Sequence, residues 1–176
     1  MATALFINRT DLVKNSIIDG NVDVDKYIQF IKVAQQIDIQ NLLGTDLYKK
    51  ISADIVGGSL AGNYLSLTNT FIQPTLIWFA QMNYIPFADY QIKNGGVFKH
   101  SSETAQNLDK NEVDYLVSKA REYANYYSTR LVDYLSFNDN LFPEYNTNSN
   151  SDIDPDKPLP QRAGPSLLAP AGSRRT

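Results

Sequence analysis

Few residues in this chain have the type and spacing that chemistry at a site requires. The one histidine, His100, has no cysteine and no second histidine to complete a metal-binding set. A structural zinc site normally takes four such ligands. We therefore interpret His100 as a solvated loop residue and expect no zinc.

Three aspartates near the C-terminus alternate as the first ligands of a calcium-binding loop do. They are Asp152, Asp154 and Asp156. Position six of such a loop would be Lys157 instead of glycine, and position twelve would be Ala163 instead of glutamate. We interpret the run as a solvated acidic linker, and we expect no metal ion there.

The common catalytic and nucleotide-binding signatures are missing from the sequence. It has no Walker loop, no GxSxG and no HExxH. The glycine-rich run at 57–62 has no strand before it and no lysine after it, so we interpret it as a connector between helices. Asp23 and Asp25 resemble helix caps more than an acid/base pair. We predict that the protein is not an enzyme and takes no cofactor.

Five of the eleven tyrosines, in contrast, lie in one segment. The tyrosines of this segment are Tyr115, Tyr123, Tyr126, Tyr127 and Tyr134. On one helix they cannot all face a single seam. Tyrosine is favoured at interfaces because its ring is apolar and its hydroxyl can pair. We assign Tyr115 and Tyr126, with Arg121 and Arg130, to a candidate oligomer interface, with ordinary half-exposed tyrosines as the alternative.

The element around which these residues must pack runs from Ile55 to Ala88. It contains no charged residue, and its second half is apolar on almost every side. Such a helix is either a buried central helix or a membrane span. Pro74 and Pro86 interrupt it, and no cluster of Lys or Arg flanks it. We therefore predict a core helix and no membrane association.

Hydrophobic spacing and capping residues predict helices on both sides of this centre. The predicted ranges are 11–18, 23–43, 46–56 and 108–137. Gly44 is the expected stop of the second range, and Asp109 with Glu112 forms a candidate cap for the last. Asn94-Gly95 predicts a tight turn, in a small hairpin or loop. Residues 4–7 could form an edge strand or an extended arm.

The composition of the 176-residue chain is that of one globular domain. Hydrophobic residues make up 43% and charged residues 20%, with a net charge of −3. There is no basic footprint for nucleic acid. There is no cysteine, which fits a reducing compartment, and no signal peptide is visible at the N-terminus.

The composition changes at Pro143. Six of the eight prolines lie from this residue onward, and no aromatic residue follows Tyr145. Such a segment cannot bury enough apolar surface to fold alone, so we predict an extended tail held by partner surfaces. The residues assigned to partner binding in it are Pro155, Pro158, Leu159, Pro160, Leu167, Leu168, Arg174 and Arg175.

The predicted fold is thus mainly α. It is an elongated bundle of about four to five helices with a small loop or β-hairpin. Residues 1–142 form the helical domain, and residues 143–176 form the extended Pro-rich tail.

Three stretches resemble the head–tail connector (adaptor, or head-completion) proteins of tailed bacteriophages. They are AQQIDIQNLLGTDLYKKI at 34–51, YLSLTNTFIQPTLIWFAQMNYIPF at 64–87 with the Asn-Gly-Gly turn after it, and DYLVSKAREYANYYSTRLVDYL at 114–135. The similarity covers roughly residues 5–140. The nearest likeness is to connectors of podovirus-like phages related to the crAss-like group. The Pro-rich tail has no counterpart in the general family pattern.

The resemblance implies a structural virion protein, made in the host cytoplasm and located in the neck of the particle. Such subunits assemble as a ring, usually of about twelve copies, beneath the portal. The ring extends the DNA channel, lets DNA pass without binding it specifically, and joins the capsid to the next tail component. The tail is then expected to dock on the portal protein.

Two other functions stay open on the sequence alone. One is a non-viral helical scaffold or peptide-binding module, which would be a monomer or dimer in solution. The other is a nucleic-acid-binding regulator, but the last long helix mixes Lys119, Arg121 and Arg130 with Glu122 and Asp133 and so has no basic face.

Overall fold

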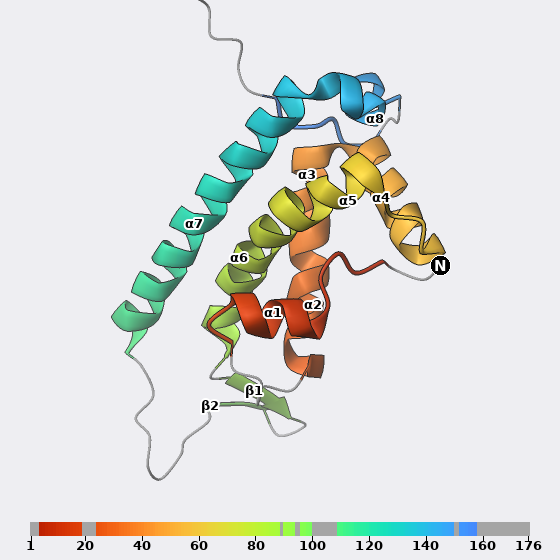
Figure 1. The fold of residues 1–176 in the computed structure, drawn as a ribbon. Helices are drawn as coiled ribbons and strands as arrows, with labels where there is room; N and C mark the ends of the chain where they lie inside the picture. The colour runs from red at the N-terminus through yellow and green to blue at the C-terminus, as the bar shows by residue number, and fades with distance from the viewer. Residues whose placement is uncertain are drawn as a thin grey trace, which may run out of the picture.

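The computed structural model describes residues 4–18, 24–88, 90–93, 96–99, 109–149 and 152–157. Its secondary structure is mainly α-helical (Figure 1). The elements in chain order are α1 (Arg9–Asn15), α2 (Val24–Ala34), η1 (Gln35–Ile39), α3 (Gln40–Leu43), α4 (Thr45–Gly57), α5 (Gly62–Leu67), η2 (Thr68–Ile72), α6 (Gln73–Tyr84), η3 (Ile85–Phe87), β1 (Tyr90–Lys93), β2 (Gly96–Lys99), α7 (Lys110–Phe137), η4 (Asp139–Leu141) and α8 (Pro143–Thr147). The predicted mainly α fold is confirmed.

Two of the long helices contain a π-helical turn. α2, η1 and α3 run on without a break, as do α5, η2 and α6, because the residues at each junction keep right-handed helical backbone angles. Pro74 follows the turn η2 and lies at the start of α6. A proline has no N–H for the helical ladder, so the wider π turn before it accommodates the missing bond.

α6 lies at the centre of the bundle, between α2 on one side and α7 on the other (Figure 1). Leu76, Ile77 and Ala80 are buried there. The predicted central core helix is therefore confirmed. Among the described helices, none is long and apolar enough to cross a membrane.

The N-terminal segment at 4–7 packs as an extended arm and not as a strand. Phe6 and Ile7 are buried. The buried Gln35 side chain accepts a hydrogen bond from the Phe6 backbone N–H at 2.9 Å and donates one to the Ala4 carbonyl at 3.0 Å. Gln73 donates to the Phe6 carbonyl at 3.0 Å. Two glutamines therefore satisfy the backbone groups that a sheet would otherwise pair.

The hairpin expected around Asn94-Gly95 is present as β1 and β2, which pair antiparallel with Tyr90 opposite Lys99 and Lys93 opposite Gly96. Asn94, Gly95 and His100 lie outside the described residues. The predicted cap of α7 is confirmed, since Asp109 and Glu112 form a reciprocal capping box. α1 is capped by Asn8 and begins at Arg9, two residues before the predicted start.

Candidate interaction surface

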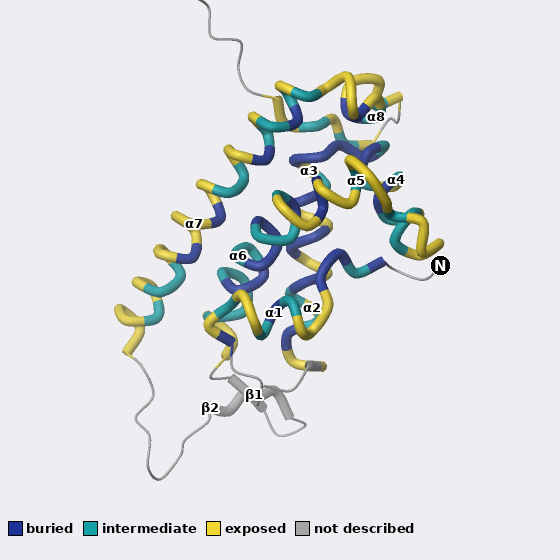
Figure 2. The backbone as a smooth tube through the Cα atoms, in the orientation of Figure 1, coloured by how far each residue is buried: buried dark blue, intermediate teal, exposed yellow. Residues whose placement is uncertain are grey.

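α7 is the longest described helix and flanks the bundle along its whole length (Figure 1). Its inner side is buried against α6, and its outer side is exposed (Figure 2). The buried residues of α7 are Ala120, Ala124, Leu131 and Leu135. The two alanines are small and allow α6 to approach closely. The two leucines, nearer the C-terminal end of α7, are part of the hydrophobic core.

Aromatic contacts hold the flank of α7 against α6 and η2. The rings of Phe71 and Tyr134 are stacked with centroids 4.1 Å apart, and Trp78 lies 4.6 Å from Tyr123. The Arg130 guanidinium lies 4.8 Å from the Phe71 ring centre. A cation over an aromatic face is attracted by the ring quadrupole, so Arg130 both contacts the bundle and remains exposed at its edge.

The face of α7 opposite the core carries three large aromatic side chains. Tyr115 is 62% exposed, Tyr126 is 65% exposed and Phe137 is 92% exposed. Each residue advances about 100° around a helix, so residues eleven apart lie on nearly the same side. The three rings therefore form one straight row, which we call the α7 stripe together with the charged residues between them.

Those charged residues are Lys119, Glu122, Arg130 and Asp133, and all four are exposed. Lys119 and Glu122 form an ion pair with 2.8 Å between Nζ and Oε2. The hydrogen bond to Glu122 raises the pKa of Lys119 above its ordinary value. The stripe thus alternates aromatic rings with charges of both signs.

The structure divides the four residues that the sequence assigned to an oligomer interface. It places Tyr115 and Tyr126 in the α7 stripe and Arg130 at its edge. Arg121 is exposed but lies about 140° away from Tyr126 around the helix, so it does not share this face. Sequence reasoning missed Phe137, although its spacing of eleven from Tyr126 was visible.

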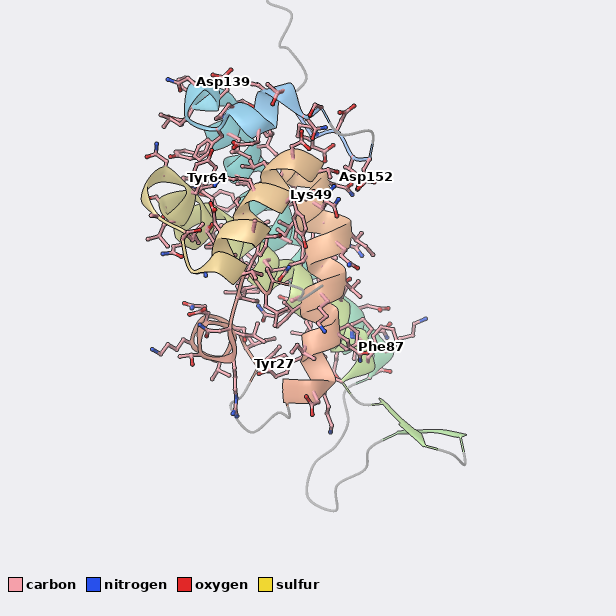
Figure 3. The ribbon with its side chains drawn as sticks, turned by 90° about the vertical axis from the view of Figure 1, so that its right-hand side faces the viewer. Tyr27, Lys49, Tyr64, Phe87, Asp139 and Asp152 are labelled. Atoms are coloured by element: carbon pink, nitrogen blue, oxygen red, sulfur yellow. The ribbon has the colours of Figure 1, made fainter. Side chains whose placement is uncertain are left out.

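The C-terminal end of the described chain packs onto the body. Pro143–Thr147 forms α8, and Tyr145 and Phe142 are buried. Residues 148–149 and 152–157, which we call the strap, lie across the junction of α3 and α4. Figure 3 shows Asp152 beside this junction, at the other end of the bundle from Tyr27. The predicted start of an extended tail at Pro143 was therefore too early, because residues 143–147 form α8 and Tyr145 still supplies a core side chain.

Backbone and side-chain hydrogen bonds hold the strap. The Thr45 N–H donates to the Ile153 carbonyl at 3.0 Å, and the Asp156 N–H donates to the Asn41 carbonyl at 2.8 Å. The Ile153 N–H donates to Thr45 Oγ1 at 2.9 Å. Thr45 therefore binds the strap through both its backbone and its side chain.

Gly44 is the closest point between the strap and the body. Its φ is 74°, and a Cβ atom placed there would lie 2.8 Å from Cδ of Pro155. Pro155 was assigned to partner binding, but it contacts its own chain. The other tail residues so assigned lie outside the described residues: Pro158, Leu159, Pro160, Leu167, Leu168, Arg174 and Arg175.

The alternating aspartates are hydrogen-bond acceptors within the fold. Asp152 Oδ2 accepts from Gln40 Nε2 at 3.1 Å and from Thr45 Oγ1 at 3.2 Å, and Asp154 Oδ1 accepts from Asn148 at 2.7 Å. The run is thus part of the strap, and its three aspartates are exposed, as expected of the solvated acidic linker that the sequence predicted. No group of His, Asp and Glu in the described parts of the chain could hold a metal ion.

Two titratable groups have strongly shifted pKa values. Burial raises the pKa of Asp38, in η1, to about 6, and a hydrogen bond with Asn83 partly opposes the shift. Its Oδ2 is buried without a hydrogen-bond partner. Burial and a 2.7 Å hydrogen bond to Glu144 raise the pKa of Tyr64 to about 12. The two groups lie on different elements and do not form an acid/base pair.

A cleft of about 280 Å³ lies between α1, α6 and α7. The amide side chains of Asn15, Asn69 and Gln73 line it together with the rings of Trp78 and Tyr127. This lining offers hydrogen bonds and aromatic contact but no charged group.

Comparison with known proteins identifies one relationship. A model of a family of unknown function, DUF6712, matches residues 39–155, which is more than half of the chain. No curated protein and no solved structure matches it. The matched range runs from η1 through α7 and α8 to Pro155 of the strap. The chain therefore belongs to the DUF6712 family.

Proposed function

We propose that the protein is a subunit of a phage head–tail connector. Copies of it form a ring, of about twelve subunits by the resemblance, beneath the portal of the virion. The ring joins the capsid to the next tail component and extends the channel through which DNA passes. Its partners are thus its own copies, the portal protein and a tail protein.

The exposed aromatic row of α7 is the observation that carries the proposal. Tyr115, Tyr126 and Phe137 are exposed to 62%, 65% and 92% along one helix. Aromatic residues, tyrosine among them, are enriched in protein interfaces relative to the rest of the surface. A ring subunit requires a lateral face of this kind that runs along its length, and α7 lies along the whole bundle (Figure 1).

The charge of the chain is compatible with a channel that DNA traverses. Nineteen acidic residues exceed sixteen basic ones. Binding of DNA through its phosphates depends on clustered Lys and Arg, and a pore that passes DNA should not hold it. The α7 stripe has equal numbers of acidic and basic residues and so provides no such cluster.

The strap determines where the tail of this proposed connector would begin. The Asp156 N–H bonds to the Asn41 carbonyl, so residues up to about 157 belong to the body. Residues 158–176 then remain for docking on the portal. Docking of this segment is supported by its composition, which has four prolines and too little apolar surface to fold alone.

Electron microscopy of the purified protein, alone and with the portal protein encoded by the same genome, tests the proposal. We expect rings coaxial with the portal ring and a matching stoichiometry by mass photometry. A chain that lacks residues 158–176 should keep its fold and lose docking. Particles that stay monomeric with the portal protein present, or full docking without these residues, would contradict the proposal.

The cleft between α1, α6 and α7 favours the second function, a helical peptide-binding module. Its amide groups and the Trp78 ring are suited to an extended peptide, whose backbone needs both hydrogen bonds and aromatic contact. Trp78→Ala would weaken peptide capture and leave ring formation intact. Loss of rings in this variant, with the fold retained, would instead link the cleft to assembly.

A further inference from the structure

The α7 stripe is symmetric about Tyr126 in residue type. Tyr115 and Phe137 lie eleven residues before and after it, and both are aromatic. The charged residues at seven and at four residues on either side are opposite in sign. They are Lys119 with Asp133, and Glu122 with Arg130.

Helix geometry keeps all seven residues on one side of α7. Steps of four, seven and eleven residues each return to within about 40° of the starting direction. The stripe from Tyr115 to Phe137 is about 33 Å long at 1.5 Å per residue. The buried residues Ala124 and Leu131 point to the opposite side, so the stripe is free of the packing against α6.

Two antiparallel copies of this helix would place complementary groups opposite one another. When the two-fold axis passes through Tyr126, each residue that precedes Tyr126 in one copy faces a residue that follows Tyr126 in the other copy. The number of residues between each of the two and Tyr126 is the same. Tyr115 then meets Phe137, and Lys119 meets Asp133. Glu122 meets Arg130, and the two Tyr126 rings meet on the axis.

We propose that two copies of the chain form a dimer through antiparallel α7 helices, with Tyr126 on the two-fold axis. The contact is isologous, since the same stripe serves both copies. A parallel pairing would place each charge opposite its own kind and is disfavoured. The bundle lies on the far side of α7 from the stripe (Figure 2), so two copies can approach without collision.

The size of the contact makes the dimer weak and reversible. Six exposed rings of 150–250 Å² each, with the stems of the charged residues, bury about 1,000 Å² in total. This area is near the lower limit for a specific protein contact. We expect a dissociation constant in the micromolar range, because ordering of the long charged side chains opposes the gain.

The ion pair within each copy is compatible with this contact. Lys119 and Glu122 are bonded in the single chain, with side chains 46% and 65% exposed. In the dimer, Asp133 and Arg130 of the partner extend this pair into a network of four charges. Arg130 keeps its position over Phe71, since its guanidinium remains exposed at the edge of the stripe.

The dimer covers the face that the proposed function assigns to the ring contact. If the protein is a connector subunit, as proposed above, free subunits are stored as dimers. Ring formation then requires the dimers to dissociate. Assembly would then depend on the neighbouring subunit of the ring competing with the dimer partner for the α7 stripe. The dimer itself is testable whatever the function.

Charge reversal tests the register of the pairing. Lys119→Glu places two negative charges opposite each other, and Asp133→Lys places two positive charges opposite each other. Each contact occurs twice in the dimer, so each variant should weaken dimerisation by about tenfold. The double variant Lys119→Glu/Asp133→Lys restores opposite charges and should recover the dissociation constant, as measured by sedimentation equilibrium.

Matched controls lie on α7 outside the stripe. Arg121→Glu and Asp114→Lys make the same changes of charge at exposed positions that lie more than 100° from Tyr126 around the helix. Both should leave the dissociation constant unchanged. Circular dichroism verifies that every variant keeps its helical content. Equal weakening by the controls, or no recovery in the double variant, would overturn the proposal.

Single cysteines test the antiparallel direction, because the chain has no cysteine of its own. With a short bismaleimide, Tyr126→Cys should cross-link to itself. Tyr115→Cys and Phe137→Cys should each fail alone but cross-link when the two proteins are mixed. Self-cross-linking of Tyr115→Cys would indicate a parallel contact and overturn the proposal.

The two proposals fail in different ways. A monomer in solution that still forms rings with the portal protein would overturn the dimer and leave the connector function standing. A dimer with the predicted cross-links that forms no ring under any condition would overturn the connector function alone.

Discussion

Tyr126 on α7 and Tyr145 on α8 are the same residue type in opposite surroundings. Tyr126 is 65% exposed, and its ring contacts that of its neighbour Tyr127. Tyr145 is 1% exposed, and its hydroxyl donates to the Asp156 carbonyl at 2.9 Å. The Tyr126 side chain lies at the surface, whereas the Tyr145 side chain packs within its own chain.

The difference extends to the regions around the two tyrosines. At the strap, hydrogen bonds join residues 152–156 to Thr45, Asn41 and Gln40. The polar groups at that end of the bundle are thus paired within the chain. At the α7 stripe, the ion pair between Lys119 and Glu122 joins two neighbours on the same helix, and the rings of Tyr115, Tyr126 and Phe137 are exposed. The hydrogen-bonded strap and the exposed aromatic rings of the α7 stripe thus lie in different parts of the molecule.

The largest contrast is expected from alanine at these two tyrosines. Tyr145→Ala removes a buried ring and a hydrogen bond, and should lower the free energy of unfolding by about 4 kcal/mol. Tyr126→Ala should change it by less than about 0.5 kcal/mol. Urea denaturation at low protein concentration measures both. Similar losses in the two variants would show that the outward face of α7 contributes to the fold.

The next effect concerns Gly44, where the strap meets the body. Gly44→Ala forces a side chain into a backbone region favoured by glycine, with φ 74° and ψ 162°, and places Cβ 2.8 Å from Pro155 Cδ. We expect a loss of about 3 kcal/mol in the free energy of unfolding. Gly58→Ala is the control, since Gly58 also has positive φ but no atom within 4 Å of the added Cβ. It should lose only about 1 kcal/mol, and an equal loss at both sites would refute the role of the strap contact.

Truncation separates the strap from the remaining tail. A chain that ends at Lys157 should have the urea midpoint of the full chain. A chain that ends at Thr147 lacks the strap hydrogen bonds to Thr45 and Asn41, and should lose about 2 kcal/mol. If both truncated chains had the same stability, the strap would not contribute to the free energy of unfolding.

The Asp38 carboxyl is half-buried, and one of its oxygens lacks a hydrogen-bond partner. Burial raises the pKa of Asp38 to about 6, so the folded state holds its proton at pH values where the unfolded chain has lost it. The stability that this group contributes is fully present below its ordinary pKa and is lost as the pH rises through about 6. Asp38→Asn should abolish this loss and stabilise the protein by about 1 kcal/mol at neutral pH, after allowance for solvent screening.

Thermal unfolding of both proteins at about pH 4 and about pH 7.5 measures this difference. The variant should gain relative to the natural chain only at the higher pH. A variant that is less stable than the natural chain at the higher pH would show that the carboxylate is needed in its charged form.

Much of the fold was predictable from the sequence because local signals and the tertiary structure agree. The glycine stop at Gly44, the capping box of Asp109 and Glu112, and the apolar centre at 55–88 each have a local physical cause. The helix predicted at 23–43 matches the continuous run of α2, η1 and α3 for the same reason. The capping box of α1 at Asn8 and Asp11 was not predicted, and the predicted start of this helix was two residues too late.

The strap could not be predicted, since its hydrogen bonds join residues more than a hundred positions apart. Proline and aspartate content indicated an extended tail, and residues 152–157 are indeed without regular structure. What composition does not reveal is that Gly44 provides a flat backbone surface for Pro155. The α7 stripe was predicted in part, because tyrosine spacing is visible and the side of the helix that faces the core is not.

The contact between Gly44 and Pro155 has a mechanical consequence. Any pulling force on the last nineteen residues enters the body at Lys157 and is transmitted first to the strap. The hydrogen bonds to Asn41 and Thr45 share this load before α8 or α7 feels it. A subunit tethered through its C-terminus would therefore yield at the α3–α4 junction while its long helix keeps its shape.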